Sequence, residues 1–354
     1  MSLTSVRAEN IRCLKKVNLE PAETNLIFGE NASGKTSLLE AIFILGRGRS
    51  FRTVSREAII TDGEREMTVA GVMSHESREI RLGISQQLGQ PPRIRVDGKD
   101  EQSAAVLARC VPVQIINPDV HQLVEEGPGV RRKFLDWGVF HVEPAFLDAW
   151  RRYHRLVRQR NAALKVRSVA QLGAWDRELA VAGECLSEYR QKYTEALGLE
   201  VSRIGNALLG STPNIVYRQG WSENSSLLEA LGESRQRDLK FGVTHAGPHR
   251  ADASIQLACR KARGRVSRGQ QKLLAATLVL AQLAHLRSAR NLRSILLLDD
   301  LAAELDPTRL EKVREVVCSL DVQVFLTALQ RSDLAAWKCS AMFHVEQGRA
   351  RSVL

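Results

Sequence analysis

Residues 29–36 read Gly29-Glu30-Asn31-Ala32-Ser33-Gly34-Lys35-Thr36, a complete G-x-x-x-x-G-K-T loop. The apolar residues 26–28 precede the loop, and residues 37–45 follow without a helix breaker, so we expect a buried strand before it and a helix after it. In such a loop the glycines let backbone amides curl around phosphates, Lys35 reaches the β- and γ-phosphates, and the Thr36 hydroxyl binds Mg²⁺. The sequence therefore predicts that residues 29–36 bind ATP, with Mg²⁺ as a second cofactor.

A second apolar stretch, residues 295–298, ends in Asp299 and Asp300. A phosphate-binding loop of this kind needs a further metal-holding group, usually a carboxylate at the end of a neighbouring buried strand. We expect Asp299 to bind Mg²⁺ together with Thr36, and Asp300 to be the catalytic residue that polarises the attacking water. Two acids at the end of a strand also fit a plain N-cap of the next helix.

The composition favours a polyanionic partner. The chain has 354 residues, enough for two domains or for one domain with a large insertion. Lys and Arg number 51 against 40 Asp and Glu, so the formal net charge is +11, as is common in proteins that bind nucleic acid. Aromatic residues make up only 5%, which argues against a single-strand binder built from stacked rings.

The cysteines and the N-terminus point to a reducing compartment. The six cysteines form no CxxC pair and no Cys/His metal spacing. The first residues lack the apolar core of a signal peptide, and no apolar run approaches the roughly 18 residues that a membrane span needs. We expect a cytoplasmic protein with no membrane partner.

The pattern of apolar residues changes twice along the chain. Strand-like alternation covers residues 3–19 and 59–96, and helical spacing with few β-branched runs covers about 131–231. Strand signals return at 254–258, 295–298 and 322–326. We predict an α/β fold in which a P-loop NTPase head with a mixed sheet, formed by 1–135 and 235–354, is interrupted by a helical insertion, 136–234.

The segment Ser267-Arg268-Gly269-Gln270-Gln271-Lys272 stands directly before a long apolar helix, 273–286. It follows the phosphate-binding loop and precedes Asp299 by about 30 residues, and in this context it resembles the signature motif of ABC-type ATPases. The resemblance implies an ABC-type head in which Ser267, Gly269 and Gln270 of one subunit cap the ATP held by another. It also implies that Asp306 lies in the loop that contacts the opposite subunit at the nucleotide.

Three other positions are compared with the same ATPases. Gln114, near the end of the apolar strand 111–116, resembles the catalytic glutamine that senses Mg²⁺ and water, although glutamines at strand ends are common. Thr327 stands where these ATPases have a switch histidine, and a Thr side chain does not titrate near neutral pH. Asp300 is one methylene shorter than the usual Glu, so we expect slow hydrolysis.

Five blocks occur in the order typical of the RecF family of bacterial recombination mediators, which the chain resembles over essentially its full length. The blocks are 29–36, Gly48-Arg49-Ser50-Phe51-Arg52-Thr53, Arg131-Arg132-Lys133-Phe134-Leu135-Asp136-Trp137-Gly138, Gly247-Pro248-His249-Arg250 and 267–272. The resemblance implies an ATP-dependent homodimer on double-stranded DNA and single-strand/double-strand junctions. It also implies cooperation with RecR and RecO in loading RecA, and a weak DNA-dependent ATPase whose slow turnover releases the clamp. A cassette-type ATPase that regulates protein partners without DNA remains the alternative.

The residues themselves suggest where DNA would bind. Between Arg131 and Arg167 there are ten Lys or Arg and three Asp or Glu. Arg151, Arg155 and Arg158 are spaced i, i+4, i+7, so one helix face would carry all three. The expected DNA contacts are Arg131, Arg132, Lys133, Arg151, Arg155 and Arg158. The alternative is a solvated helix face with ion pairs inside the helix, for which Asp148 is the nearest acid.

Overall fold

The computed structural model describes residues 1–75, 78–167, 169–258 and 260–353, and it divides the chain into two compact units. We call residues 1–120 with 286–354 the head unit, and residues 121–285 the helical unit. No described helix is both long enough and apolar enough to cross a membrane. The five described cysteines are unpaired, and Cys259 lies outside the described residues.

These units differ from the expected boundaries of 136–234 for the insertion. The helical unit extends further on both sides, from His121 to His285. On the C-terminal side it contains a small sheet of its own, whose strands come from 214–218, 252–257 and 260–261. The signature segment 267–272 therefore lies in the helical unit, and not in the head as its place in the sequence suggested.

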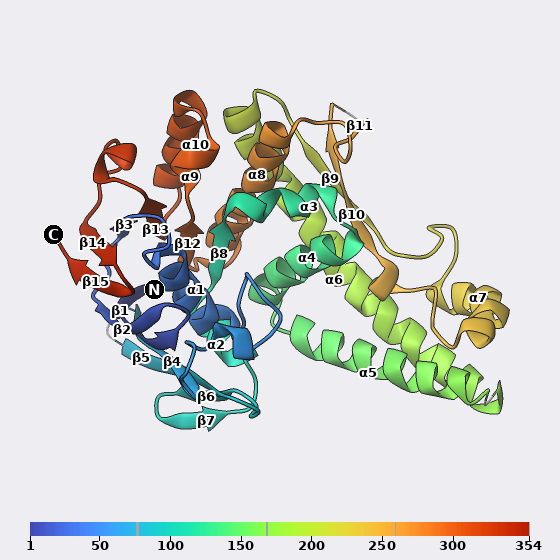
Figure 1. The fold of residues 1–354 in the computed structure, drawn as a ribbon. Coiled ribbons are helices and arrows are strands. Elements are labelled where there is room, and N and C mark those ends of the chain that lie inside the picture. Colours follow the sequence, from blue (N-terminus) through green and yellow to red (C-terminus); the bar gives the residue numbers. More distant parts are fainter. Residues whose placement is uncertain (76–77, 168, 259, 354) are drawn as a thin grey trace. The chain divides into compact units, whose positions relative to one another are not determined.

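The nucleotide loop belongs to a largely parallel sheet of the head unit (Figure 1). In spatial order its strands are β15 (Arg349–Ser352), β14 (Ala341–Glu346), β3 (Thr24–Phe28), β13 (Val322–Ala328), β12 (Ser294–Leu298) and β8 (Val113–Ile116). All neighbours are parallel except β14 and β15. Every residue of β12 and β13 is buried, as expected for central strands covered on both faces.

A second, antiparallel sheet completes the head unit. Its strands, in spatial order, are β2 (Leu14–Leu19), β1 (Ser2–Ile11), β4 (Glu66–His75), β5 (Arg78–Gln87), β6 (Arg93–Val96) and β7 (Lys99–Glu101). The helix α1 (Lys35–Arg47) shares one hydrophobic core with residues of both sheets, including Leu3, Val69 and Phe325. Because α1 is buried nearly all round, its first turn and the loop before it are held firmly.

The remaining head elements are short. They are α2 (Ala105–Cys110), α9 (Leu301–Glu304), α10 (Pro307–Ser319), and the 3₁₀ turns η1 (Glu57–Ile59) and η4 (Arg331–Leu334); η2 (Pro118–His121) leads out of the unit. The α9 and α10 helices follow β12 directly, so they continue from the edge of the sheet at which Asp299 and Asp300 lie.

The helical unit contains one long helix, α6 (Val169–Leu209), with α5 (Phe146–Lys165) alongside (Figure 1). Its other helices are α3 (Gln122–Glu125), α4 (Pro128–Val142), α7 (Leu227–Phe241) and most of α8 (Arg268–Arg290), with the turn η3 (Pro248–Arg250). Its sheet is antiparallel, in the order β11 (Arg260–Lys261), β10 (Asp252–Leu257), β9 (Asn214–Arg218). Gly138 allows α4 to approach α6, since a Cβ there would lie 1.9 Å from the Tyr193 hydroxyl.

Candidate nucleotide site and basic surface

The phosphate-binding loop has the form that the sequence predicts, between β3 and α1. The Lys35 side chain is buried, and its Nζ donates hydrogen bonds to the carbonyl oxygens of Gly29 and Glu30 at 2.8 and 2.9 Å. The ammonium group is thus folded back over the loop, where a phosphate would lie. Asn31 and Ala32 are exposed at the tip of the loop, while Ser33 and Gly34 are buried.

Two glycines of the loop are required by its geometry. Gly29 and Gly34 have φ values of +154° and +118°, a backbone conformation that residues with a Cβ rarely adopt. A Cβ at Gly29 would lie 2.1 Å from the carbonyl oxygen of Val345, and a Cβ at Gly34 would lie 2.9 Å from Leu14. The positive φ values, together with the close approach of Gly29 to a backbone carbonyl and of Gly34 to the Leu14 side chain, explain why the motif has glycine at both positions.

Asp299 is joined to the loop by side-chain hydrogen bonds. The Thr36 hydroxyl lies 3.1 Å from Asp299 Oδ1, and the Thr327 hydroxyl donates to the same oxygen at 2.9 Å. Parallel pairing of β3, β13 and β12 brings the ends of these strands to one edge of the sheet, which is why residues 36, 299 and 327 meet. Thr36 and Asp299, which the sequence analysis expects at one metal site, therefore lie within hydrogen-bond distance of each other.

The electrostatics of Asp299 suit a cation ligand. Burial raises the pKa of its carboxyl above the ordinary value, and the neighbouring Asp300 adds to this, while Thr327, Thr36 and Arg52 lower it. A hydroxyl and a buried carboxylate within hydrogen-bond distance are hard oxygen donors of the kind that Mg²⁺ takes alongside nucleotide phosphates. The residues present thus fit Mg²⁺, and Thr36 and Asp299 are the side chains that would hold it.

Asp300 occupies a strained position at the strand end. Its φ of +51° is unusual for a residue with a side chain, and its backbone N–H donates to the Thr327 hydroxyl at 2.8 Å. Thr327 therefore holds both acids, because it donates to Asp299 and accepts from Asp300. Sequence comparison placed Thr327 at the switch position but did not reveal this double contact, which depends on the pairing of β12 with β13.

Gln114 lies near the end of β8, as the sequence indicated, two residues before the strand ends at Ile116. It is buried inside β8, opposite Leu296, whereas the backbone N–H of Asp299 donates to the carbonyl of Ile116. The strand continues two residues past Gln114 because Ile115 and Ile116 still pair with β12. A role for Gln114 at the attacking water stays a prediction.

Two further site residues cap helices. Ser267 precedes α8, and its hydroxyl accepts from the backbone N–H of Gln270 at 3.4 Å while Gln270 Oε1 accepts from the Ser267 N–H at 3.1 Å. This reciprocal capping fixes the exposed N-terminus of α8, including Gly269. Asp306 caps α10 in the head unit by accepting from the Arg309 N–H at 3.0 Å.

Arg52, in the block at 48–53, is held by an ion pair with the helix α1. Arg52 lies 3.4 Å from the buried Glu40 carboxylate, which Arg12 contacts at 3.0 Å. Glu40 projects from α1, so these two ion pairs tie the segments around residues 12 and 52 to the helix that follows the loop.

The expected DNA contacts separate into two groups. Arg131 is 5% exposed and makes a bidentate ion pair with Asp252, at 2.7 and 3.1 Å. Arg132 is half-buried and donates to the Ala251 carbonyl at 2.6 Å. The expectation that Arg131 contacts DNA is wrong in this structure, because the fold uses its guanidinium internally; Arg132 is partly used, and Lys133 is exposed.

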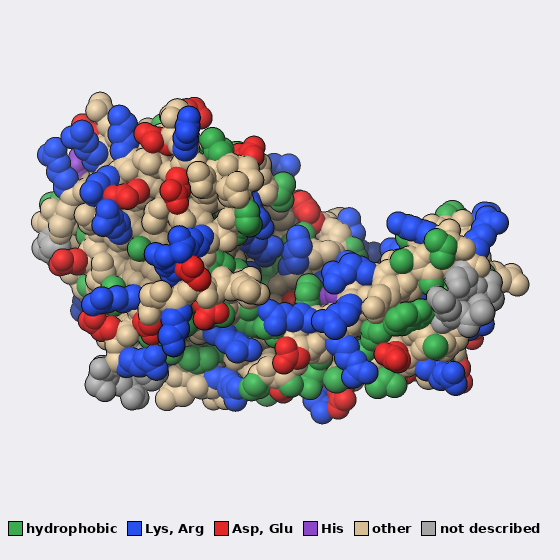
Figure 2. Space-filling view, turned by 90° about the horizontal axis from the view of Figure 1, so that it is seen from below, with side chains coloured by type: hydrophobic (Ala, Val, Ile, Leu, Met, Phe, Trp, Pro, Cys, Tyr) green, Lys and Arg blue, Asp and Glu red, His purple; other side chains and the backbone are tan. Residues whose placement is uncertain are grey.

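Arg151, Arg155 and Arg158 are all exposed on α5, as the helical spacing predicts. Tyr153, Leu156 and Val157 occupy the buried face of the same helix. Beside α5 lies a hollow of about 740 Å³ whose lining includes Arg151, Arg152 and Arg155. Figure 2 shows the side of the molecule on which α5 lies, with Lys and Arg side chains spread along this part of the helical unit.

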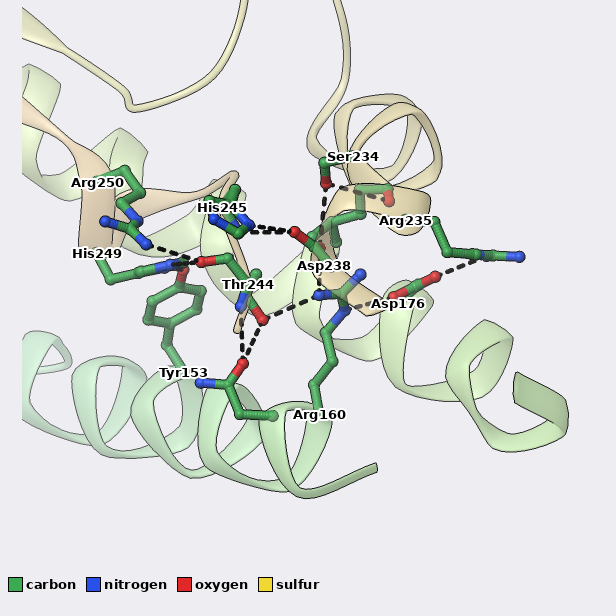
Figure 3. A network of polar contacts seen from close by, with 12 residues as sticks. Tyr153, Arg160, Asp176, Ser234, Arg235, Asp238, Thr244, His245, His249 and Arg250 are labelled. Carbon is green, nitrogen blue, oxygen red and sulfur yellow. Dashed lines mark hydrogen bonds and ion pairs between the residues drawn. The ribbon is translucent and has the colours of Figure 1, made fainter. Parts of the chain in front are cut away.

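Arg160 counts toward the basic stretch of sequence but not toward this surface. It is fully buried and pairs with both Asp176 and Asp238 at 2.7 Å (Figure 3). The Arg235 guanidinium contacts the second oxygen of Asp176, and the His245 ring contacts Asp238. This network joins α5, α6 and α7, so Arg160 is a structural residue.

The block Gly247-Pro248-His249-Arg250 is joined through Thr244 to the same buried polar network. His249 Nε2 faces the Thr244 carbonyl at 2.9 Å, and Nδ1 faces the Tyr153 hydroxyl at 2.6 Å (Figure 3). A carbonyl can only accept, so Nε2 carries the proton and Nδ1 accepts from Tyr153. Burial lowers the pKa of His249 to about 4, which keeps the ring neutral, and the exposed Arg250 follows on a fixed turn.

A family model described as the RecF/RecN/SMC N-terminal domain matches residues 2–351. A DNA replication and repair protein RecF of Pseudomonas putida (strain W619) is 41% identical over 360 residues, covering 99% of this chain and 98% of the relative. The chain belongs to the RecF family. A RecF of Pseudomonas aeruginosa (strain UCBPP-PA14) is 42% identical, with 99% and 97% of the two chains covered.

Solved structures agree with this family and fold. A structure titled as the recombination mediator protein RecF with ATP in the RecFOR pathway has a TM-score of 0.89 at 27% identity, and covers 99% of this chain and 97% of its own. An Smc head bound to a domain of ScpA has a TM-score of 0.58 at 15% identity, over 100% and 98% of the two chains, and shows the shared fold alone. The expected ABC-type, SMC-like ATPase fold of this RecF-family chain is confirmed.

Proposed function

We propose that this chain is an ATP-dependent DNA-binding recombination mediator that acts as a slowly hydrolysing switch. The observation that carries the proposal is the contact of Thr36 and Thr327 with Asp299 beside a buried Lys35, within a chain of the RecF family. Its relatives are named DNA replication and repair proteins, and one solved relative is titled as bound to ATP.

Within this proposal, residues 29–36 bind the phosphates of ATP. Lys35 leaves its two loop carbonyls for the β- and γ-phosphates, and the backbone amides of the loop and the first turn of α1 donate to phosphate oxygens. Thr36 and Asp299 hold Mg²⁺, which would neutralise charge on the phosphates. Asp300 orients the attacking water, and Gln114 assists from β8.

Slow turnover follows from the shape of this site. Asp300 is short, and its backbone is fixed by Thr327, so its carboxylate has little freedom to follow the water. We expect a turnover number well below the enzyme median of about 10 s⁻¹. Such a rate suits a switch between bound and released states.

The signature segment is proposed to close the site in a homodimer. Ser267, Gly269 and Gln270 form the N-terminus of α8, where Ser267 and Gln270 are exposed, and a helix N-terminus attracts anions through its dipole. They would cap ATP bound to the partner subunit, with Asp306 contacting that subunit.

The Ser267→Arg variant tests this arrangement. It should leave ATP binding by the monomer unchanged and prevent ATP-dependent dimerisation, as measured by light scattering. Ser226→Arg is the matched control, because Ser226 also caps an exposed helix, α7, through the same reciprocal pattern. Loss of monomer binding in Ser267→Arg alone would show that Ser267 acts on its own subunit.

DNA is proposed to bind along the exposed arginines of α5. Contacts of this type are made to phosphates, so they give affinity without base readout and depend strongly on salt. Double-stranded DNA and single-strand/double-strand junctions are the proposed ligands. RecR and RecO are proposed as protein partners because a solved relative is titled as part of the RecFOR pathway. Loading of RecA at gaps is proposed from the family resemblance alone.

The deciding experiment is a fluorescence anisotropy titration with duplex DNA, with ATP and with ADP, at two salt concentrations. We expect binding that requires ATP and weakens as salt rises. If ATP binds but duplex and junction DNA do not, the chain regulates protein partners instead.

A further inference from the structure

The small sheet of the helical unit has two unlike edges. At one edge, β11 has only two residues, Arg260 and Lys261, and both are exposed. Short length and charge are ordinary means of protecting an edge from pairing with another chain. At the other edge, β9 has five residues, of which only Arg218 at its end is charged. Among the described strands, β9 pairs with β10 alone.

The register shows which backbone groups of β9 point away from the sheet. The Ala262 N–H donates to the Ile255 carbonyl, so the backbone groups of Ile255 face β11. Peptide groups alternate in direction along an antiparallel strand, so those of Ser254 and Gln256 face β9.

The pairing of β10 with β9 then fixes the direction of the β9 groups. Ser254 pairs with Val216, and Ile255 pairs with Ile215. Val216 is therefore bonded to β10, while the N–H and C=O groups of Ile215 and Tyr217 point outward.

A groove of about 540 Å³ runs beside this edge. One wall is formed by four consecutive residues of β9, Asn214 to Tyr217, and the other by Gln191, Thr194, Glu195 and Gly198 of α6. The α6 residues are spaced i, i+3, i+4, i+7 and so lie on one face of the helix. Figure 1 shows β9 next to α6. A strand edge beside a helix is the geometry in which proteins bind extended peptides as an added strand.

The charge of the groove is opposite to that of the whole chain. Its described lining includes Glu195 and Glu223 but no Lys or Arg, whereas the chain carries +11. Both carboxylates are exposed, and Glu195 accepts a hydrogen bond from Gln191 at 3.0 Å. An occupant with Lys or Arg side chains would therefore be favoured over an acidic one.

We propose that this groove binds an extended segment of a partner protein that carries Lys or Arg, and that the segment joins the sheet as a fourth strand. Its backbone pairs with the outward N–H and C=O groups of Ile215 and Tyr217, and its basic side chains lie near Glu195 and Glu223. The five residues of β9 span roughly 16 Å at about 3.3 Å per residue, so a segment of similar length is sufficient. This site is separate from the residues proposed to bind ATP and DNA.

Amide hydrogen exchange on the full-length protein, followed by NMR, tests the pairing. The probe is a nonapeptide of alternating Lys and Val, used up to millimolar concentration, with an alternating Glu and Val peptide as its control. We expect the amides of Ile215 and Tyr217 to exchange rapidly without peptide and to be protected by the basic peptide only. The amide of Val216, bonded to β10, should be protected throughout and serves as the internal reference.

Charge variants test the specificity. Glu195→Gln with Glu223→Gln should weaken binding of the basic peptide roughly 2- to 30-fold, as expected for two exposed ion pairs. Glu233→Gln with Glu315→Gln removes the same charge from exposed positions elsewhere and should have no effect.

Three results would overturn the proposal. Protection of Ile215 and Tyr217 in the free protein at every concentration would mean that the edge is already covered. Protection that grows with protein concentration alone would identify a second copy of this chain as the occupant. Binding of the basic peptide without protection of these two amides, or equal binding of the acidic peptide, would exclude strand addition at this site.

Discussion

The nucleotide loop of the head unit and the arginines of the helical unit hold their charges in different ways. In the loop, one buried Lys35 contacts only backbone carbonyls, which a phosphate would replace. In the helical unit, Arg131 and Arg160 are buried and paired with Asp side chains, whereas Arg155 and Arg158 on the same chain segment are exposed. A buried cation that contacts only neutral carbonyls can exchange them for the phosphate of a ligand. A buried cation paired with carboxylates instead stabilises the fold, because removing it would leave buried negative charges unpaired.

This difference shows that basic residues close together in sequence can have opposite roles. Arg158 and Arg160 are two positions apart on α5, yet one faces solvent and the other is fully buried. Helical geometry separates them by about 200° around the axis, so they face nearly opposite directions. Variants that change either the buried, paired cations or the exposed arginines test this difference.

The largest expected effect is that of Lys35→Met on ATP binding. Removing a buried, hydrogen-bonded charge that pairs with phosphate costs roughly 2–5 kcal/mol, which corresponds to a loss of affinity of tens- to thousands-fold. Isothermal titration with ATP measures it. Lys338→Met, at an exposed position of the head unit, should bind ATP normally. Equal affinity of the two variants would contradict the role of Lys35.

The sharpest test of the buried class is Arg160→Met against Arg158→Met. Loss of Arg160 leaves Asp176 and Asp238 without their buried partner, and should lower the free energy of unfolding by about 3–5 kcal/mol. The exposed Arg158 should contribute less than about 0.5 kcal/mol. Urea unfolding followed by tryptophan fluorescence compares them, and similar losses would remove the distinction between the two classes.

The exposed class is tested by changing Arg151, Arg155 and Arg158 to Ala together. If each contacts one phosphate, the slope of log affinity for duplex DNA against log salt should fall in magnitude by about 2.7. ATP binding should be unchanged. The matched control replaces the exposed arginines Arg177, Arg203 and Arg237 of the same unit, and should retain the original slope.

The smallest expected effect concerns the pH dependence of Mg²⁺-supported ATP binding. Because the pKa of Asp299 is raised by burial, its carboxylate is lost at a higher pH than an ordinary Asp as the solution is acidified. Its contribution to folding stability is largest below the ordinary Asp pKa and is lost as pH rises through the raised value. Mg²⁺ needs the ionised form, so binding should weaken as pH falls through that value.

Thr327→Val removes a hydrogen bond that lowers the pKa of Asp299, so the loss of binding should move to higher pH, whereas Thr327→Ser should behave like the original chain. Titration of a fluorescent ATP analogue across pH, with and without Mg²⁺, measures the midpoint. An unchanged midpoint in Thr327→Val would show that this hydroxyl does not govern the ionisation of Asp299.

Much of the nucleotide site could be predicted from the sequence because its parts are local. The loop between Gly29 and Thr36 is contiguous, and its glycines and lysine act through backbone geometry that the motif itself defines. Asp299 was predictable from a buried strand that ends in an acid. The position of Gln114 near a strand end was predictable in the same way, but its pairing with Leu296 was not, because it depends on how β8 aligns with β12.

The sequence by itself determined the phosphate loop, the exposed face of α5 and the family, since each follows from residues at fixed spacing along one segment. Only the tertiary structure decided which arginines are exposed and which are buried in ion pairs, that Thr327 joins the two acids, and that β9 is an edge strand beside α6. These features depend on partners distant in the sequence, such as Thr327, 28 residues from Asp299, and Asp252, 121 residues from Arg131. Pairings at that distance depend on how strands and helices pack, which local spacing does not specify.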